Sequence, residues 1–314
     1  MIPTVSKRSA GVARVHAVVV SWEGKALLPS CLAALAAQQR AFDAVWVVDN
    51  GSTDGTGAML ASDFPSVRVV ANEQNLGYGR ANNLALQRAL DDGADFVALI
   101  NNDVELEPGW LGAMLAAADA VAGAGLFAGT LLFQGDERVN STGLEIDALG
   151  RARDRDFKVE RALLRREDGP VQGVSGGAAL LRATMLRKVG LFDPAYFAYY
   201  EDVDLSLRAA RLGHGSRYVG AAVARHRFGA TFGPGSPRQR YLLGRGHLRT
   251  LALHQPLWKA AALVPLTAAY RVAVKAPLEL LRARPALAWA ELRAAAMGLV
   301  AAAQAALQRL TSGR

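Results

Sequence analysis

Three carboxylates crowd into one short segment of the chain, YFAYYEDVDLSLR (196–208). Four aromatic residues come first, and Glu201, Asp202 and Asp204 follow directly. An acid held close to another acid and beneath aromatic rings has its pKa raised, so that it can act as a general base toward a hydroxyl. The alternative is structural, because acids in the first turn of a helix stabilise the positive end of its dipole. The segment read alone leaves both interpretations open.

Four polar clusters follow apolar runs in the first hundred residues. SWEGK follows HAVVV (16–20), DNGSTDGT follows AVWVV (44–48), NEQNLGYGRANN follows VRVV (67–70), and NNDVE follows FVALI (96–100). Each cluster alone is explained by ordinary turn residues. Valine-rich runs that alternate with helical patterns, however, predict a parallel sheet covered on both faces. Ligands bind such sheets beyond the carboxyl ends of the strands, so we expect a ligand site at this edge.

The residues in these clusters indicate the class of ligand. The first cluster contains neither G-x-G-x-x-G nor a P-loop. Asp49 ends the second run and can hydrogen-bond a base or ribose, whereas Asp103 follows the fourth run beside Asn101 and Asn102. A carboxylate beside amides suits a hard divalent cation that also keeps water and phosphate ligands. We therefore expect a nucleoside diphosphate with Mg²⁺ or Mn²⁺.

The hydrophobic pattern also predicts the elements that must position these groups. Helices are expected over about 25–39, from 54, over about 79–90 and from 202, the last closed by Gly213. RARDRDFKVERALLRRED (151–168) is dense in both charges, which predicts a solvated hairpin or a mobile loop, with an active-site lid as the alternative. Asp204 would lie about 200° around a helix from Asp202 and should point away from the reacting centre.

The ordered set of motifs resembles a known family. VVVSWEGKALLPSCLAAL, VVDNGSTDGT, NLGYGRANN, LINNDVELEPGWL, GLFDPAYFAYYEDVDLSLRAARLG and VARHRFGAT occur in the order typical of family-2 glycosyltransferases, in particular of bacterial rhamnosyltransferase-like members. The resemblance covers about residues 14–232 and extends loosely into the tail through YLLGRGHLRTL. It implies an α/β fold of the GT-A type (nucleotide-diphospho-sugar transferase), a Rossmann-like and mostly parallel sheet with helices on both faces.

The resemblance implies a role for each matched position. Asp202 matches the catalytic base and Glu201 an acceptor-binding acid. Tyrosine rings pack against the C–H faces of sugars, so Tyr199 is expected at the acceptor, and Gly176 and Gly177 permit close approach there. The expected metal ligands are Asp103, His226 and Asn101, the last replacing the first aspartate of the D-x-D motif. The expected donor-binding residues are Ser21, Glu23, Asp49, Ser52, Asn75, Gly77, Asn83 and Asn102; Glu23 stands where relatives often carry Asn.

The implied activity is inverting, metal-dependent sugar transfer from a nucleotide sugar to a hydroxyl of a lipid-linked or polysaccharide acceptor in cell-surface glycan biosynthesis. The likeness favours L-rhamnose from dTDP-L-rhamnose, with UDP-hexoses next. A cation at Asp103 and His226 would stabilise the charge of the leaving nucleoside diphosphate. A sugar-phosphate nucleotidyltransferase and a non-catalytic glycan-binding protein remain alternatives, although the former should carry a Gly-rich basic loop where SWEGK stands.

The excess of basic over acidic residues lies at the end of the chain. The 314 residues carry a net charge of +8, and residues 238–314 hold 12 Lys and Arg against Glu279 and Glu291. We expect a catalytic domain at 1–237 and a basic amphipathic helical tail at 238–314. Basic residues spaced among Leu, Ala, Val and Trp favour an anionic membrane surface over nucleic acid. Helices packed on the catalytic domain, or a homodimer, are the alternatives for the tail.

The remaining composition bears on location. The single cysteine, Cys31, excludes an internal disulfide and fits a reducing cytoplasm. The N-terminus does not match a signal peptide, and the longest uninterrupted apolar runs are shorter than the 18 residues typical of a membrane span. A protein bound peripherally to the inner face of the cytoplasmic membrane is therefore expected.

Overall fold

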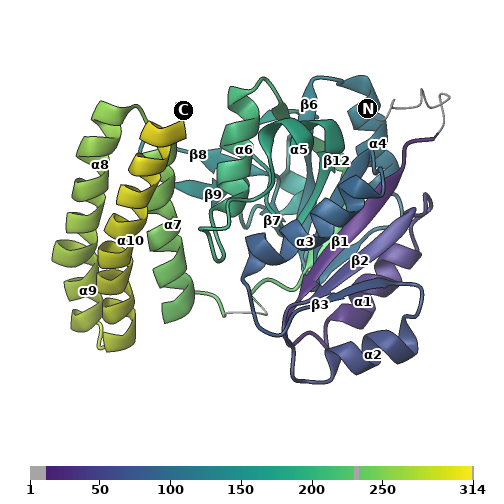
Figure 1. Ribbon diagram of the computed structural model, residues 1–314, viewed down its shortest axis with the longest axis horizontal. Helices are drawn as coiled ribbons and strands as arrows, with labels where there is room; N and C mark the ends of the chain where they lie inside the picture. The colour runs from purple at the N-terminus through teal and green to yellow at the C-terminus, as the bar shows by residue number, and fades with distance from the viewer. Residues whose placement is uncertain (1–11, 230–232, 313–314) are drawn as a thin grey trace, which may run out of the picture.

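A ten-stranded mixed sheet forms the body of the protein in the computed structural model, which describes residues 12–229 and 233–312 (Figure 1). Its N-terminal half is parallel, in the order β4-β1-β2-β3. Ser21 lies beside Asp49 and Val20 beside Asn101, so the carboxyl ends of these strands form one edge, as predicted. The four strands are β1 (Val15–Ser21), β2 (Ala44–Asp49), β3 (Arg68–Ala71) and β4 (Phe96–Asn101).

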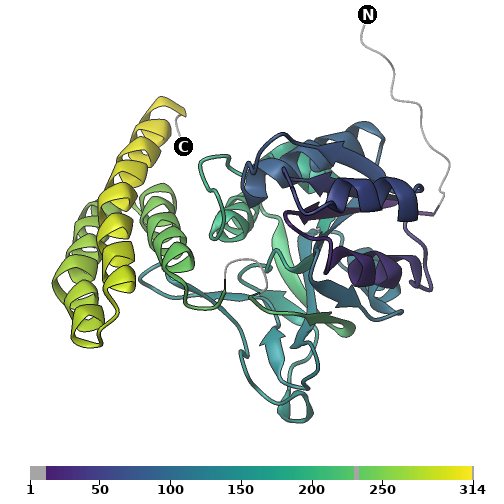
Figure 2. The ribbon, with the colours of Figure 1, turned by 90° about the horizontal axis from the view of Figure 1, so that it is seen from below.

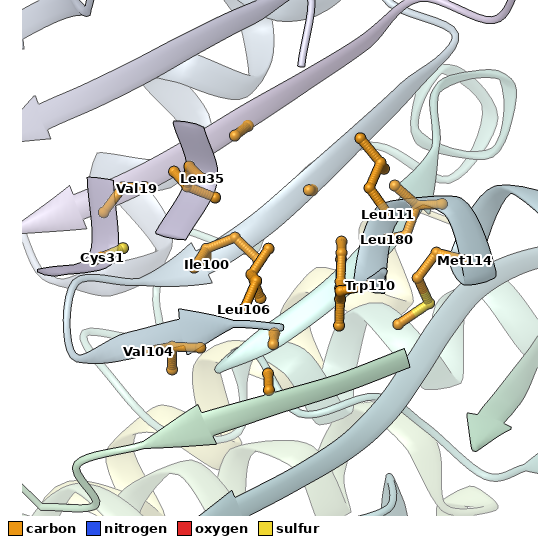
Figure 3. Close-up of a cluster of buried hydrophobic side chains, with 14 of the residues drawn as sticks. Val19, Cys31, Leu35, Ile100, Val104, Leu106, Trp110, Leu111, Met114 and Leu180 are labelled. Atoms are coloured by element: carbon orange, nitrogen blue, oxygen red, sulfur yellow. The ribbon is translucent and has the colours of Figure 1, made fainter. Parts of the chain in front are cut away.

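Helices cover both faces of this sheet. Alternate residues of β1 point to opposite faces: Val19 packs in a core with helices α1 and α4, whereas Val18 packs with α3 and α5. Figure 3 shows the first core, in which Trp110 of α4 is fully buried near Leu106 and Leu180. The helices are α1 (Leu28–Ala36), α2 (Thr56–Asp63), α3 (Tyr78–Asp91), α4 (Trp110–Ala120) and α5 (Ala183–Val189). Helix α1 is shorter than expected because it begins beside Pro29, after a turn closed on the Gly24 carbonyl.

The second half of the sheet brings His226 back toward the fourth strand. β11 (Ala178–Arg182) runs antiparallel between β4 and β6 (Ala124–Phe133), and β12 (Gly215–His226) runs parallel to β6. β5 (Val104–Leu106) pairs with β12 so that Val104 lies opposite His226, which places Asp103 next to that histidine. β7 (Val139–Ser141) and β10 (Gly169–Val171) extend this half at its margins.

The charged segment 151–168 is partly ordered. Ala152–Asp154 forms strand β9, which pairs with β8 (Leu144–Ile146) in a separate hairpin, and Arg161–Leu163 forms a short 3₁₀ helix. The segment therefore contributes only one strand to a hairpin whose other strand precedes it, so a hairpin within 151–168 is not observed. The observed hairpin lies against the rest of the protein: the Tyr200 hydroxyl accepts a hydrogen bond from the backbone N–H of Ala152 at 3.3 Å.

The C-terminal residues form a helical group, in which α7 lies between the sheet domain and the remaining helices (Figures 1 and 2). Helix α6 (Glu201–Arg211) precedes β12 and ends before Gly213, whose φ of +78° fits the predicted cap. The helices of the tail are α7 (Pro237–His254), α8 (Leu257–Tyr270), a π-helical turn (Arg271–Lys275), α9 (Ala276–Leu281) and α10 (Pro285–Ser312).

Two tail segments, Leu257–Leu281 and Pro285–Thr311, are long and apolar enough to cross a membrane by length and composition alone. The sequence predicts no membrane span here because the apolar runs are interrupted. Mean hydropathy tolerates such interruptions, whereas the requirement for an uninterrupted run does not. Most of the first segment is exposed, whereas nearly half of the second is buried. Glu291 of the second is fully buried and pairs with Arg271 and, at 3.2 Å, with Arg240.

Candidate functional site

A cavity of about 290 Å³ opens at the carboxyl edge of the parallel strands. One wall comes from this edge, through Val20, Asn50 and Asn101 among others. The opposite wall comes from the segment before α6 and the start of that helix, and the β8–β9 hairpin closes a third side. The cavity therefore brings both groups of candidate residues, the strand-end amides and the acids, to one place.

Residues 193–204, here called the acid segment, turn sharply into α6. The backbone of Tyr199 and Tyr200 has φ values of +67° and +75°, which are uncommon for bulky residues. Glu201 and Asp202 follow as the first two residues of the helix, and both line the cavity. The backbone conformation of the two tyrosines thus decides where the acids point.

The environments of Glu201 and Asp202 differ. Glu201 is 5% exposed, and its Oε2 has no hydrogen-bond partner in the described part of the chain. Burial, reinforced by the charge of Asp202, raises the pKa of Glu201 well above its usual range. Asp202 is partly exposed, and its Oδ2 accepts a hydrogen bond from the Gly176 N–H at 3.1 Å. Burial also raises the pKa of Asp202, although the backbone N–H groups of Gly176 and Val203 oppose the shift.

Asp204 occupies a different environment, as the helical geometry predicts. Its Oδ2 accepts a hydrogen bond from Arg208 Nε at 2.8 Å, and its Oδ1 lies 2.7 Å from His254 Nε2 of α7. Burial disfavours the charged form, but the His254 hydrogen bond and the Arg208 charge outweigh it and lower the pKa of Asp204. The three acids therefore occupy two environments. Glu201 and Asp202 face the cavity, whereas Asp204 connects α6 to the tail.

Asp103 and His226 meet beside the cavity with unsatisfied acceptors. His226 Nε2 lies 3.2 Å from Asp103 Oδ1, and His226 Nδ1 lies 2.7 Å from Asn140 Oδ1. A neutral imidazole that donates Nδ1–H to Asn140 leaves Nε2 as an acceptor facing a carboxylate oxygen. Asp103 Oδ1 and Asn101 Oδ1 are both buried without hydrogen-bond partners in the described residues.

These donors fit a divalent cation. A ligating histidine usually donates its second N–H to an oxygen, as His226 does to Asn140 in this arrangement. A carboxylate, an imidazole and an amide oxygen leave further positions for phosphate and water. Across residues 12–229 and 233–312, no third His, Cys, Asp or Glu completes a protein-only metal site.

Three of the predicted donor residues line the cavity. They are Asn75, Gly77 and Asn102. The Asn75 side chain accepts hydrogen bonds from Asn50 at 3.0 Å and from the Gly77 N–H at 2.9 Å. Gly77 has a φ of +83°, and a Cβ there would lie 2.3 Å from the Phe197 carbonyl oxygen. The strand edge and the acid segment therefore approach each other closely at this glycine.

The other predicted donor residues support the loops and do not line the cavity. Glu23 accepts hydrogen bonds from the N–H and hydroxyl of Thr53, and its own N–H donates to the Ser52 hydroxyl at 2.9 Å. Asp49 accepts from the Ser52 N–H at 3.0 Å. Both ends of the Asn83 amide bond the backbone of Phe192. Ser21 accepts from the Asn102 side chain at 3.1 Å beneath the cavity floor.

The predicted acceptor residues all line the cavity. Gly176, besides donating to Asp202, accepts a hydrogen bond from the Tyr78 hydroxyl at 2.7 Å. A Cβ on Gly176 would lie 2.9 Å from that hydroxyl, so the group that closely approaches this glycine in the structure is Tyr78. Gly177 and Tyr199 lie on the same wall. The Tyr199 hydroxyl accepts a hydrogen bond from Gln239 of α7 at 3.2 Å.

Sequence reasoning missed Asp154. This residue ends β9, lines the cavity and hydrogen-bonds the side chain of Ser141. Burial, with a smaller contribution from the charge of Asp202, raises the pKa of Asp154 to about 6. The density of charge in RARDRD is typical of a solvated surface. The side chain of Asp154 faces the cavity because β9 pairs with β8. Asn50, Trp22 and Phe197 line the cavity as well and were also missed.

The chain belongs to glycosyl transferase family 2. Residues 17–190 match the model of that family, and residues 158–303 match the model of glycosyl transferase family group 2. A similar relative is N-acetylglucosaminyl-diphospho-decaprenol L-rhamnosyltransferase of Mycobacterium tuberculosis, in strains CDC 1551 / Oshkosh and ATCC 25618 / H37Rv. The identity is 34% over 204 residues, which span 58% of this chain and 66% of the relative.

Solved structures show the same GT-A fold. The mannosyltransferase PcManGT from Pyrobaculum calidifontis, in complex with GDP-Man and Mn²⁺, has a TM-score of 0.55 and 19% identity over 95% of this chain and 88% of that one. S. aureus TarS 1-349 in complex with UDP-GlcNAc has a TM-score of 0.56 and 15% identity over 96% and 92% of the two chains. These likenesses confirm the predicted fold class.

Proposed function

We propose that this chain is an inverting, cation-dependent glycosyltransferase that moves L-rhamnose from dTDP-L-rhamnose to a hydroxyl of a lipid-linked glycan. The observation that carries the proposal is the pair of acids at the edge of a cavity whose other wall is formed by strand-end amides. The activity named for the 34% identical relative supports the choice of sugar and of a lipid-linked acceptor. One direct displacement by the acceptor hydroxyl gives inversion.

The two acids divide the proton chemistry. Asp202, held by the Gly176 N–H, accepts the proton of the attacking hydroxyl. A raised pKa brings its basicity closer to that of a useful base near neutral pH. Burial raises the pKa of Glu201 well above its usual range, which favours the protonated carboxyl. A protonated carboxyl can donate a hydrogen bond to an acceptor oxygen. Glu201 therefore binds the acceptor without taking the reacting proton.

We also propose that Asp103, His226 and Asn101 hold Mg²⁺ or Mn²⁺. Their convergent acceptor atoms support this assignment. A bound cation supplies charge stabilisation for the departing nucleoside diphosphate. The donor nucleotide would lie along Asn50, Asn75 and Asn102, which line the wall at the strand edge.

The decisive experiment is a screen of nucleotide sugars with Mg²⁺ or Mn²⁺, using an N-acetylglucosaminyl-diphospho-lipid as acceptor. We expect acceptor-dependent release of dTDP from dTDP-L-rhamnose, faster than release of UDP from UDP-hexoses. Release of pyrophosphate from dTTP and a sugar 1-phosphate would instead identify a nucleotidyltransferase. Binding of nucleotide sugars without any product would identify a non-catalytic binding protein.

The tail is proposed to attach the enzyme to the inner face of an anionic membrane, where a lipid-linked acceptor lies. Trp258 is 77% exposed and Leu281 85% exposed, on a tail whose 12 Lys and Arg far outnumber its two acids. Each basic residue near an anionic surface contributes on the order of 1 kcal/mol, so high salt should weaken binding. Exposed tryptophan suits the interfacial region of a bilayer.

Vesicle flotation tests this attachment. Trp258→Gln combined with Leu281→Gln should reduce recovery on anionic vesicles, whereas Leu163→Gln, at a similarly exposed leucine of the sheet domain (66%), should not. Neutral vesicles should bind the unmodified protein less well than anionic ones. Equal recovery of all variants would contradict the proposal, and a change from dimer to monomer in the double variant would favour a contact between copies of the chain.

A further inference from the structure

The turn into α6 requires support from outside the acid segment. Tyr199 and Tyr200 both have positive φ values, a conformation that a non-glycine residue keeps only where surrounding contacts hold it. The N–H of Tyr78 donates to the Phe197 carbonyl at 2.6 Å and supports one side of the segment. The other side of the segment packs against α7.

A buried glycine in the interior of α7 meets this turn. A Cβ on Gly246 would lie 2.9 Å from the Tyr199 carbonyl oxygen and 3.0 Å from Tyr200 Cβ. Glycine is a poor helix former, so its place inside an 18-residue helix needs a reason. The close approach of the strained turn supplies that reason, because only a residue without a side chain leaves room for it.

Further contacts from α7 hold the rest of the acid segment. The hydroxyls of Thr250 and Tyr196 lie 2.7 Å apart, and both residues are buried. Arg245 donates to the Ala195 carbonyl at 2.9 Å, and Arg249, which is 3% exposed, pairs with Asp193 at 2.5 Å. Because Gly246 and Thr250 are four residues apart, they lie on the same face of the helix. One face of α7 thus contacts the segment from residue 193 to residue 200.

The opposite face of α7 belongs to the helical tail. A Cβ on Gly244 would lie 2.6 Å from Ala294 Cβ of α10 and 2.6 Å from Arg271 Nη1. Two residues of helix correspond to about 200°, so Gly244 and Gly246 face in nearly opposite directions. Helix α7 is therefore a shared wall, with the acid segment on one side and the rest of the tail on the other.

We propose that α7 is a positioning element of the catalytic site, and that Gly246 and Thr250 hold the Tyr199–Tyr200 turn in the conformation that directs Glu201 and Asp202 into the cavity. The functional unit then extends past residue 237, through the whole of α7. The kinetic consequence rests on the proposed glycosyltransferase function, whereas the structural consequence does not.

The test compares glycine variants in the full-length protein. Gly246→Ala should lower kcat by roughly 10- to 100-fold, because a small displacement of a catalytic group has effects of that size. Donor KM should stay within about twofold, because the strand edge is untouched. Gly112→Ala, at a helical glycine of α4 with open space around its Cβ, is the matched control and should leave kcat unchanged. Gly244→Ala should disturb the packing of α10 with a smaller loss of kcat.

A second pair of variants protects the test against misfolding. Thr250→Val removes the hydroxyl that meets Tyr196 and should lower kcat with donor binding retained, whereas Thr250→Ser keeps the hydroxyl and should restore it. Hydrogen exchange should rise at residues 196–204 in Gly246→Ala and Thr250→Val, and in neither control. If the unmodified protein transfers no sugar, the proposed function fails while hydrogen exchange still tests the positioning. Equal exchange and equal kcat in Gly246→Ala and Gly112→Ala would overturn the inference.

Discussion

The two walls of the cavity are held in different ways. The loops at the carboxyl edge of the parallel strands bind one another: Glu23 holds Thr53, Asn50 holds Asn75, and Asn102 holds Ser21. All of these partners lie within the first 102 residues. The acid segment contacts this edge at Tyr78, but most of its support comes from a helix about fifty residues further along the chain, through pairs such as Tyr196 with Thr250.

This difference separates donor binding from acid positioning. The donor wall is a property of the parallel sheet and its own turns, so changes in the tail should leave it intact. The acid wall depends on α7, so changes there should reach the chemistry without reaching the nucleotide. Mutations can therefore be sorted by the wall that they disturb.

The largest expected effect falls on the acid wall. Asp202→Asn removes the group that accepts the proton, and transfer should slow by roughly 10²–10⁴ while donor affinity is retained. Glu201→Gln keeps a hydrogen-bond donor, so it should mainly raise the acceptor KM. Single-turnover transfer and donor binding measured for both variants decide the assignment. Near-normal transfer by Asp202→Asn would show that Asp202 is not the base. A larger chemical defect in Glu201→Gln would assign that role to Glu201 instead.

The donor wall is tested through the cation. Asp103→Ala should abolish Mn²⁺ binding in the presence of dTDP, because it removes the only acid among the proposed ligands. Asn140→Leu should weaken Mn²⁺ binding by roughly 10- to 100-fold, because it removes the partner that orients His226. Electron paramagnetic resonance of free Mn²⁺ measures both effects without any turnover. Unchanged affinity in Asp103→Ala would show that the cation, if required, binds elsewhere.

The contact between the acid wall and the tail is tested at Asp204. Asp204→Asn leaves Arg208 and His254 without their buried carboxylate, and loss of one partner of such a pair lowers the free energy of unfolding by about 3–5 kcal/mol. Asp92→Asn, at a partly exposed carboxylate paired with Arg14 and Arg68, is the control and should change Tm far less. Similar Tm changes in the two variants would contradict the role of this contact.

The pH dependence of the same contact has a defined sign. Because the pKa of Asp204 is lower in the folded protein than its ordinary value of 3.8, its contribution is fully present above that value. The contribution is lost as the pH falls through the lowered pKa. Tm of the unmodified protein should therefore fall more steeply below about pH 4 than Tm of Asp204→Asn. Parallel Tm curves for the two proteins in acid would contradict the assignment.

The smallest expected effect belongs to Asp154 and has the opposite sign. Its pKa is about 6 in the folded protein against 3.8 ordinarily, so folding favours the protonated form. Stability is then lost as the pH rises from about 4 to about 6. Asp154→Asn should raise Tm at pH 7 and leave Tm nearly unchanged at pH 4. A lower Tm for Asp154→Asn at pH 7 would show that the carboxylate is stabilised in the folded protein.

Much of the site was accessible from sequence because its residues follow strands. Asn75 and Asn102 could be predicted at the cavity because parallel strands share one carboxyl edge. Asp49 and Asn83 show the limit of that reasoning: each lies near the edge, but their side-chain oxygens or amides bond backbone groups instead of lining the cavity. A motif gives the position of a residue along the chain and leaves the direction of its side chain open.

Local residue patterns were enough to predict the alternation of strands and helices, the polar edge of the sheet and the place of Asp202 and Asp204 on opposite sides of one helix. These properties follow from local periodicity and from residues close together in the chain. Three other features come from the folded chain: Asp154 lines the cavity, His254 contacts Asp204, and Gly246 lies against the turn before Glu201. Each of these depends on contacts between residues far apart in sequence, and such contacts leave no periodic signal along the chain.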